Sequence, residues 1–221
     1  MLEERAICWP KTLREAKELQ ESLKKEIRLT PLHREPSFVA AVDAAFTDDN
    51  KIIGVAVLYT YADLKHIETS CALEDVHFPY VPGFLTFREG PALVKAIKLL
   101  KKEPDVILFD GQGIAHPRGM GIASHIGLLL DIPSIGVAKS RLFGYYREPG
   151  REKGSYSLLL SNKRVIGAVL RTRSNVKPLF VSPGHKIDIK GAIEIVLKCT
   201  TKYRIPEPLR KADRLSKELK P

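Results

Sequence analysis

Two aspartates interrupt segments that otherwise have the composition of buried strands. Asp43 follows the apolar run Phe38–Val42, and Asp110 follows the apolar run Val106–Phe109. A lone ionised carboxylate in such surroundings costs several kcal/mol unless another group compensates its charge. One partner held between two neighbouring strands would compensate both, and a divalent cation has the charge to do so. The two aspartates therefore predict a metal site.

Glu89 adds a third carboxylate, and Mg²⁺ prefers a few carboxylates completed by water and phosphate oxygens. Such an ion would polarise a scissile phosphate and lower the pKa of an attacking water, which points to a nuclease. Two of the carboxylates also have structural alternatives. Thr86 and Glu89 have the spacing of a capping box, and Asp110 precedes a glycine and can begin a turn. Asp43 has no such role in the interior of a strand.

The residues after Asp110 suggest a ligand site beside these carboxylates. The loop from Gly111 to Gly113 resembles the start of a dinucleotide fingerprint, but His116 takes the place of the required small residue, so we reject that cofactor. Glycines also let the backbone approach a flat ligand such as a base. Lys139 ends an apolar strand and is expected to pair with the carboxylates or with a phosphate; a surface position is its alternative.

A stiff loop precedes Glu89 in the sequence. Pro79 and Pro82 fix their own φ angles, so the segment Pro79–Gly83 has few accessible conformations. A tyrosine on such a turn, here Tyr80, can act as a wedge between stacked bases. An exposed loop tyrosine without a function is the alternative.

The pattern of apolar positions predicts the elements that must position these residues. We expect helices over 12–28, 84–102, 120–130, 188–200 and 207–219, and strands over 37–46, 51–60, 64–74, 105–110, 134–138, 155–160 and 164–171. Thr12 and Glu15 have the spacing of a capping box at the start of the first helix. Pro91 should lie in the first turn of the second helix, where proline is tolerated.

Three consecutive strands joined by short turns should pair antiparallel, and the strand–helix–strand unit that follows should be a right-handed parallel crossover. This order matches an α/β, ribonuclease H-like fold, a mixed β-sheet with helices on both faces, in a single domain spanning residues 1–221. Asp43 would lie on the first strand and Asp110 on the fourth. Neighbouring strands are about 4.8 Å apart, so the two carboxylates can share a cation.

The distribution of charge is uneven along the chain, whose formal net charge is +10. Residues 1–140 carry 17 Lys and Arg against 19 Asp and Glu, a net −2, whereas residues 141–221 carry 19 against 7, a net +12. A basic surface next to an acidic catalytic half suits a phosphate polymer as the ligand. Plain solubility is the alternative explanation.

The cysteines and the apolar segments indicate the compartment. Cys8, Cys71 and Cys199 have no paired spacing and are expected to be reduced thiols, as in a cytoplasmic protein. The first residues lack the apolar run of a secretory signal, and no stretch approaches the roughly 20 apolar residues of a membrane span. We therefore expect a cytoplasmic protein without a membrane partner, and a monomer.

The segments described so far belong to a series of motifs that runs through residues 36–214. The series comprises Phe78–Gly83, Phe87–Pro91, Phe109–Gly113 with Ala115–Arg118, Ile122–His125, Gly136–Ser140, Val181–His185 and Arg204–Pro208. Each motif is modest by itself. In this order and over nearly the whole chain, they resemble the endonuclease V family, the deoxyinosine 3′-endonucleases.

The resemblance implies a ribonuclease H-like fold and a phosphodiester hydrolysis that depends on Mg²⁺, with Mn²⁺ as a substitute. It implies a DNA repair enzyme that cuts the second phosphodiester bond 3′ to a deaminated base, chiefly hypoxanthine, and leaves a 3′-hydroxyl and a 5′-phosphate. Inosine-containing damaged DNA is the implied partner, with single-stranded DNA or RNA as further partners.

The resemblance also assigns roles to individual positions. The catalytic residues would be Asp43, Glu89, Asp110, Lys139 and His116, of which Asp43, Glu89 and Asp110 bind the metal. The DNA-binding residues would be Pro79, Tyr80, Pro82, Gly83 and Arg88, and the base pocket would comprise Leu85, Gly111, Gly113, Ile122 and Gly127. One position departs from the pattern of some members, which have a histidine where this chain has Asp213. That aspartate either helps to hold the metal or is a surface residue.

Three functions remain open on these grounds. The first is the repair endonuclease, the second a nuclease of the same fold that acts on RNA containing inosine or on branched DNA, and the third a nucleic-acid-binding module without catalysis. The acidic set favours chemistry. Selectivity has a physical basis, because a poorly paired hypoxanthine costs less to extrude than a normal base. Main-chain groups of a glycine-rich pocket can then form hydrogen bonds with its N1 proton and its C6 oxygen. This donor and this acceptor are the reverse of those that adenine has at the same positions.

Overall fold

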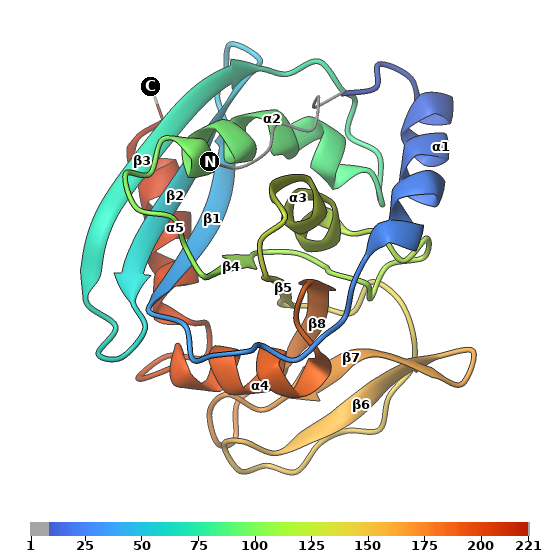
Figure 1. Ribbon diagram of the computed structural model, residues 1–221, viewed down its shortest axis with the longest axis vertical. Helices are drawn as coiled ribbons and strands as arrows, with labels where there is room; N and C mark the ends of the chain where they lie inside the picture. Colours follow the sequence, from blue (N-terminus) through green and yellow to red (C-terminus); the bar gives the residue numbers. More distant parts are fainter. Residues whose placement is uncertain (1–8, 221) are drawn as a thin grey trace.

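One mixed β-sheet of eight strands runs through the part of the chain that the computed structural model describes, residues 9–220 (Figure 1). The strands are β1 (Phe38–Phe46), β2 (Lys51–Thr60), β3 (His66–Asp75), β4 (Val106–Phe109), β5 (Ser134–Ala138), β6 (Tyr156–Ser161), β7 (Arg164–Leu170) and β8 (Leu179–His185). Their order across the sheet is β3-β2-β1-β4-β5-β8-β7-β6. β4 pairs in parallel with β1 and β5, and the other pairs are antiparallel.

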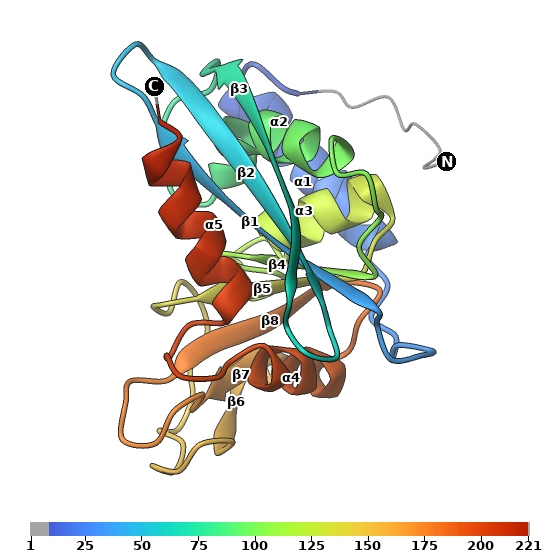
Figure 2. The same cartoon turned by 90° about the vertical axis from the view of Figure 1, so that its left-hand side faces the viewer.

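Helices cover both faces of this sheet (Figures 1 and 2). They are α1 (Leu13–Leu23), which continues into the short 3-10 helix η1 (Lys24–Glu26), α2 (Leu85–Lys98), α3 (Ile122–Leu130), α4 (Ile189–Lys198) and α5 (Glu207–Glu218). α2 and α3 pack on one face, and α4 and α5 pack on the other. Within residues 9–220, no helix has both the length and the apolar composition needed to cross a bilayer.

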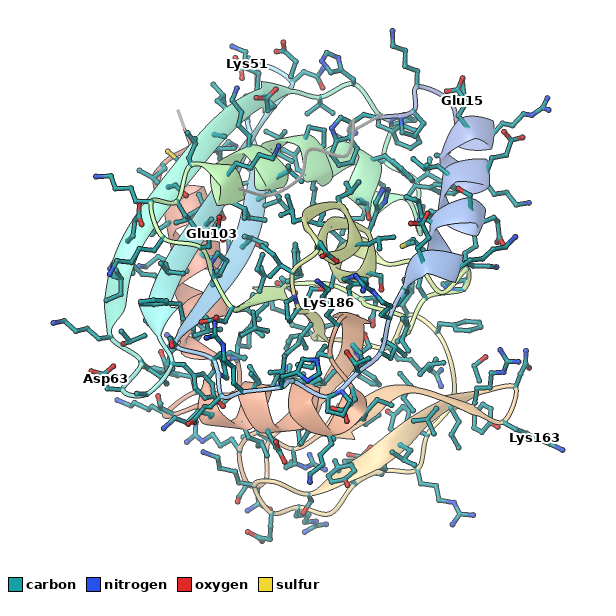
Figure 3. The ribbon with its side chains drawn as sticks, viewed as in Figure 1. Glu15, Lys51, Asp63, Glu103, Lys163 and Lys186 are labelled. Atoms are coloured by element: carbon teal, nitrogen blue, oxygen red, sulfur yellow. The ribbon has the colours of Figure 1, made fainter. Side chains whose placement is uncertain are left out.

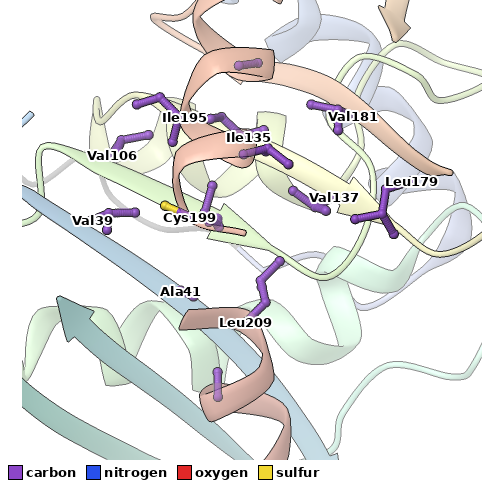
Figure 4. Close-up of a cluster of buried hydrophobic side chains, with 14 of the residues drawn as sticks. Val39, Ala41, Val106, Ile135, Val137, Leu179, Val181, Ile195, Cys199 and Leu209 are labelled. Carbon is purple, nitrogen blue, oxygen red and sulfur yellow. The ribbon is translucent and has the colours of Figure 1, made fainter. Parts of the chain in front are cut away.

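The alternation of side chains along the central strands divides the core into two parts. On β1, Val39 and Ala41 belong to the cluster on the side of α4 and α5, part of which Figure 4 shows, whereas Val42 contacts the side of α2 and α3. β4 follows the same rule, with Leu108 on the α5 side and Phe109 on the opposite side. The residue that follows Val42 and the residue that follows Phe109 therefore both point toward α5.

Charged side chains mark the tips of the hairpins. Lys51 lies where β1 turns into β2, Asp63 lies between β2 and β3, and Lys163 lies between β6 and β7. All three point away from the body of the protein (Figure 3). Cys71 and Cys199 are free thiols, as expected; Cys8, for which the same was expected, lies outside the described residues.

Most of the predicted elements are present, and the capping box of α1 forms. The Glu15 N–H donates to Thr12 Oγ1 at 3.2 Å, and the Thr12 N–H donates to Glu15 Oε2 at 3.1 Å.

The position expected for Pro91 was wrong. α2 begins at Leu85, so Pro91 is its seventh residue and lies inside the helix, beyond the first turn.

β8 was not predicted as a strand, because Pro183 and Gly184 are uncommon within strands. It nevertheless joins β5 to β7 and completes the second half of the sheet. Its pairing with β5 shifts in register between Ser134 and Ile135, and Ile135 is the partner of Pro183. Such an irregularity accommodates a residue that cannot donate a ladder hydrogen bond.

Candidate active site

Three aspartates meet on two adjacent strands and the helix that covers them. Val42 of β1 pairs with Phe109 of β4, so Asp43 and Asp110, each one residue further along, are neighbours on the α5 side of the sheet. Asp213 reaches them from α5. One carboxylate oxygen of each aspartate lies within 4.8 Å of the others, and we call Asp43, Asp110 and Asp213 the aspartate cluster. Asp213 is thus placed at the site and not on a remote surface.

Ser216 fixes one member of the cluster. Its side chain is fully buried, and its hydroxyl donates to Asp43 Oδ2 at 2.7 Å while lying 3.0 Å from the carbonyl oxygen of Asp213. Sequence reasoning missed this residue. Its signal was the spacing of three residues from Asp213, which puts both side chains on one face of α5.

The electrostatics of the cluster favour a bound cation. Burial raises the pKa of Asp43 to about 6, the negative charges of Asp110 and Asp213 add to this, and the hydrogen bond from Ser216 opposes it. An opposite charge would favour the ionised form again. Three carboxylate oxygens at one point are the hard donor set that Mg²⁺ and Mn²⁺ accept. The residues present therefore fit a divalent cation.

Glu89 faces the cluster but does not belong to it. It lies on α2, on the opposite layer of the sheet from α5, and is not among the three residues whose oxygens lie within 4.8 Å of one another. Burial raises the pKa of Glu89 to about 8, and the charges of Asp43 and Asp110 contribute. The capping-box alternative was wrong, because the N-cap of α2 is Phe84 and no side chain caps the helix. Metal binding by Glu89 stays a prediction.

Lys139 follows β5 and forms an ion pair with the cluster. Its Nζ lies 2.6 Å from Asp110 Oδ2. Burial acts to lower the pKa of Lys139, but the hydrogen bond and the charge of Asp110 outweigh it and the pKa is raised, so the side chain remains a cation. Arg204 Nη2 donates to the carbonyl oxygen of Lys139 at 3.1 Å and holds the backbone at this point.

The loop Pro79–Gly83, called here the wedge loop, is on the surface. The Tyr80 side chain is 71% exposed, and Pro79 and Pro82 are exposed as well. Gly83 has φ +83°, a left-handed conformation that favours glycine. The wedge loop therefore presents its tyrosine to solvent from a rigid turn, as the predicted wedge requires.

The carbonyl oxygen of Gly83 anchors the wedge loop to the rest of the protein. It accepts hydrogen bonds from His116 Nε2 at 3.0 Å, from Arg118 Nη2 at 2.6 Å and from Gln20 Nε2 at 3.1 Å. Gln20 lies on α1, is almost fully buried, and also donates to the carbonyl oxygen of Met120 at 3.0 Å. Sequence reasoning missed Gln20, because only the fold brings α1 next to these loops.

His116 belongs to this anchor. Its Nδ1 accepts the Arg118 N–H at 3.2 Å, which leaves Nε2 as the donor to Gly83. Burial lowers the pKa of His116 to about 4, the charge of Arg118 adds to this, and the hydrogen bond to the Gly83 carbonyl opposes it. The imidazole is therefore neutral near pH 7. It lines the same cavity as Asp110 and Lys139, but both ring nitrogens are already engaged.

A cavity of about 380 Å³, called here the wedge-side cavity, lies between the wedge loop and the aspartate cluster. Leu85, Gly111 and Ile122 line it together with Tyr80, Gly83, Asp110 and Lys139. Gly113 and Gly127 were predicted for this pocket and do not line it. A Cβ at Gly113 would lie 2.0 Å from the Pro183 carbonyl oxygen, and one at Gly127 would lie 1.9 Å from Ser134 Oγ. These two glycines allow close packing on β8 and β5.

Arg88 was predicted to bind DNA, and the structure gives it another position. Its Nη1 donates to the carbonyl oxygen of Phe78 at 2.9 Å, and its guanidinium lies 4.4 Å from the centre of the Phe46 ring. The side chain thus supports the segment that enters the wedge loop, and DNA binding by Arg88 stays a prediction.

A mixed sheet with acidic side chains at the ends of two adjacent parallel strands is the arrangement of ribonuclease H-like nucleases. The sequence profile of Endonuclease V matches residues 21–214. An endonuclease V from Dictyoglomus turgidum is 49% identical over 205 residues, which are 93% of this chain and 90% of the relative. One from Methanothrix thermoacetophila is 53% identical over 202 residues, 91% and 89% of the two chains. This chain belongs to the endonuclease V family.

Solved structures agree with this assignment and confirm the ribonuclease H-like fold. The endonuclease V of Streptomyces avermitilis superposes with a TM-score of 0.91 at 41% identity, covering 96% of this chain and 94% of its own. An endonuclease V of Ciona intestinalis was solved with a 23mer DNA containing an inosine followed by a ribo-adenosine. It superposes with a TM-score of 0.83 at 30% identity and covers 94% of this chain and 96% of its own.

Proposed function

We propose that this chain is a metal-dependent DNA repair endonuclease that acts beside deaminated bases, chiefly hypoxanthine. It hydrolyses the second phosphodiester bond 3′ to the lesion and leaves a 3′-hydroxyl and a 5′-phosphate. The aspartate cluster carries the proposal, because its three carboxylate oxygens lie within 4.8 Å of one another and one of the three residues, Asp110, lines a cavity large enough for a flat base. The inosine-containing DNA bound by the Ciona relative supports the choice of substrate.

Asp43, Asp110 and Asp213 would hold the cation, Mg²⁺ or in its place Mn²⁺, and Glu89 would face it from α2. When bound, the ion supplies a Lewis acid that polarises the scissile phosphate and lowers the pKa of a neighbouring water. Lys139 remains protonated beside Asp110. Its charge offsets the negative charge that develops on the phosphate in the transition state.

The wedge loop and the wedge-side cavity would recognise the lesion. Tyr80, exposed on a turn that Gly83 anchors, would fill the space that the extruded nucleotide leaves in the stack. The cavity would take the base, and the backbone of the loop at Gly111 can approach the ring closely because no side chain intervenes.

The test uses strands labelled at the 5′ end that carry either inosine or adenine at one position, prepared as DNA and as RNA. The expected result is one nick in the inosine strand, at the second bond 3′ to the lesion, in Mg²⁺ but not in chelator. The new 3′ end should be extendable by a polymerase. Asp43→Asn and Asp110→Asn should abolish the nick while the variants still bind the strand.

Each alternative predicts a different outcome. Binding of inosine strands without any metal-dependent nick would identify a non-catalytic module. Cleavage of the RNA but not of the DNA would identify a ribonuclease. Equal cleavage of the inosine and adenine strands would reject lesion recognition.

We also propose that the protein acts as a monomer in the cytoplasm. Burial raises the pKa of the Cys199 thiol to about 12, so this thiol is unreactive at neutral pH, as suits a reduced structural cysteine. Light scattering on the eluted protein should give the mass of one chain, and a mass of two chains would reject the monomer.

A further inference from the structure

A second cavity lies on the α5 side of the aspartate cluster. It measures about 390 Å³, and we call it the helix-side cavity. Its wall includes four cations, Lys139, Arg210, Lys211 and Arg214, of which the last three project from α5. The family resemblance assigned no role to these three residues.

Asp110 and Lys139 line both cavities, so the cluster lies between them. A DNA strand whose extruded base occupies the wedge-side cavity must run past Asp110 and Lys139 before it can enter the helix-side cavity. In the proposed function the cut is 3′ to the lesion. The part of the strand that enters the helix-side cavity is therefore the part 3′ to the cut.

The charges of the helix-side cavity suit a phosphate chain. Its four cations face three carboxylates, Glu207, Asp110 and Asp213. Asp110 and Asp213 belong to the aspartate cluster, whose negative charge a bound divalent cation would offset. Four cations against three carboxylates leave the cavity with one net positive charge even in chelator, and lysines and arginines are the usual ligands of backbone phosphates.

The three cations of α5 differ in how firmly they are held. Arg210 is fixed, because its Nη1 lies 3.1 Å from Glu207 Oε2 and its guanidinium stacks 3.4 Å from the centre of the Tyr203 ring. Arg214 is 59% exposed and lies 3.5 Å from Glu218 Oε1, a solvent-exposed pair of small strength. Lys211 has no carboxylate within ion-pair distance among residues 9–220. Lys211 and Arg214 are thus available to a ligand.

We infer that α5 binds the backbone phosphates of the strand immediately 3′ to the cut, with Arg210, Lys211 and Arg214 as the phosphate ligands. The inference rests on the proposed function and adds to it a subsite for the departing 5′-phosphate strand. It assigns two roles to one helix, since the same α5 supplies Asp213 and Ser216 to the aspartate cluster.

The test compares two double variants. The α5 variant is Lys211→Ala/Arg214→Ala, and the α4 control is Lys190→Ala/Lys198→Ala. The control pair removes the same charge from α4, which packs on the same face against β7 and β8 and does not line either cavity. Binding is measured in chelator, where no cutting occurs, with inosine strands that share one 5′ arm. Their 3′ arms end at the second bond, one nucleotide beyond it, or several nucleotides beyond it.

Wild-type protein and the α4 control should bind more tightly as the 3′ arm lengthens, and the α5 variant should lose most of this gain. The slope of log affinity against log salt should fall in magnitude by about 0.7 for each single-strand phosphate that the variant no longer neutralises. Lys211→Arg/Arg214→Lys, which keeps both charges, should restore the gain. An α5 variant that keeps the wild-type dependence on arm length and salt would overturn the inference, as would an α4 control with an equal loss.

The two proposals fail separately. Absence of an inosine-dependent nick by the wild-type protein rejects the proposed function. A normal nick by the wild-type protein, combined with unchanged binding by the α5 variant, rejects the phosphate subsite alone.

Discussion

The aspartate cluster and the wedge-side cavity are adjacent, but different interactions hold them in place. Asp43 lies within β1, Asp110 directly follows the paired strand β4, and Asp213 lies on a helix packed against those strands. Much of the wall of the cavity comes from loops, and hydrogen bonds at the Gly83 carbonyl join the wedge loop to the loop that carries His116 and Arg118. The geometry of the cluster thus depends on the whole sheet, whereas the proposed recognition of the lesion depends on a few hydrogen bonds that can change without unfolding.

The largest effect should follow from removing a carboxylate of the cluster. Asp213→Asn should lower the cleavage rate by more than about a hundredfold, since losing a metal ligand costs more than losing a group that merely supports one. Glu89→Gln should cost less, because Glu89 lies outside the cluster. Single-turnover rates at saturating protein measure both. A larger loss for Glu89→Gln than for Asp213→Asn would show that the ion sits on the α2 side.

Ser216→Ala should give a smaller loss of rate, about tenfold, because Asp43 stays but loses the hydroxyl that orients it. The hydrogen bond from Ser216 lowers the pKa of Asp43. Its removal should therefore raise that pKa and move the acidic limb of the pH–rate profile to higher pH. Ser216→Thr keeps the hydroxyl and should restore the profile. An unchanged profile in Ser216→Ala would mean that packing alone positions Asp43.

Gln20→Ala tests the loop side of the comparison. The preference for inosine over adenine strands in binding should fall by about threefold, less than 1 kcal/mol, while the single-turnover rate at saturation stays near that of the wild type. The carbonyl of Met120 loses its Gln20 donor, so the free energy of unfolding should fall by about 1–3 kcal/mol. Tyr80→Ala is the companion variant, because it should lower the same preference without this loss of stability. A fall in saturating rate for Gln20→Ala would contradict the separation of the two regions.

The pH dependence of stability should give the smallest effect. Glu89 has a pKa raised from 4.5 to about 8 by burial and by its acidic neighbours. The folded protein therefore holds a proton that the unfolded chain has released, and the free energy of unfolding should fall as pH rises from 4.5 toward 8. In chelator, Glu89→Gln should flatten this decline and be more stable than the wild type at pH 8, by roughly 1–3 kcal/mol.

Thermal unfolding at a series of pH values measures this effect, with Glu103→Gln as the exposed control. Glu103, labelled in Figure 3, is exposed in the segment between α2 and β4. A wild-type profile that does not change between pH 6 and pH 8 would show that Glu89 is ionised in the folded state.

The sequence predicted the positions of Asp43 and Asp110 well, because an aspartate directly after a run of apolar strand residues is a conspicuous local signal. It also predicted that the first and fourth strands are neighbours and that the fourth and fifth strands run parallel, and both predictions are confirmed. The strand β8 was missed because Pro183 and Gly184 lower the local preference for a strand. Pairing with β5 and β7 nevertheless stabilises a strand at this place. The close packing of Gly113 and Gly127 on β8 and β5 could not be predicted, because a glycine does not reveal which neighbour lies where its side chain would be.

The sequence by itself determined the order of the elements, the two aspartates that follow apolar runs and the stiffness of the wedge loop, since each follows from residues close together in the chain. Only the tertiary structure decided that Asp213 and Ser216 of α5 complete the cluster and that Gln20 of α1 anchors the wedge loop. These partners lie about 100 residues or more from the groups they touch, except for Gln20 and Gly83, which are 63 apart. Interactions over such separations arise from the packing of whole helices on the sheet, and no local pattern of residues encodes them.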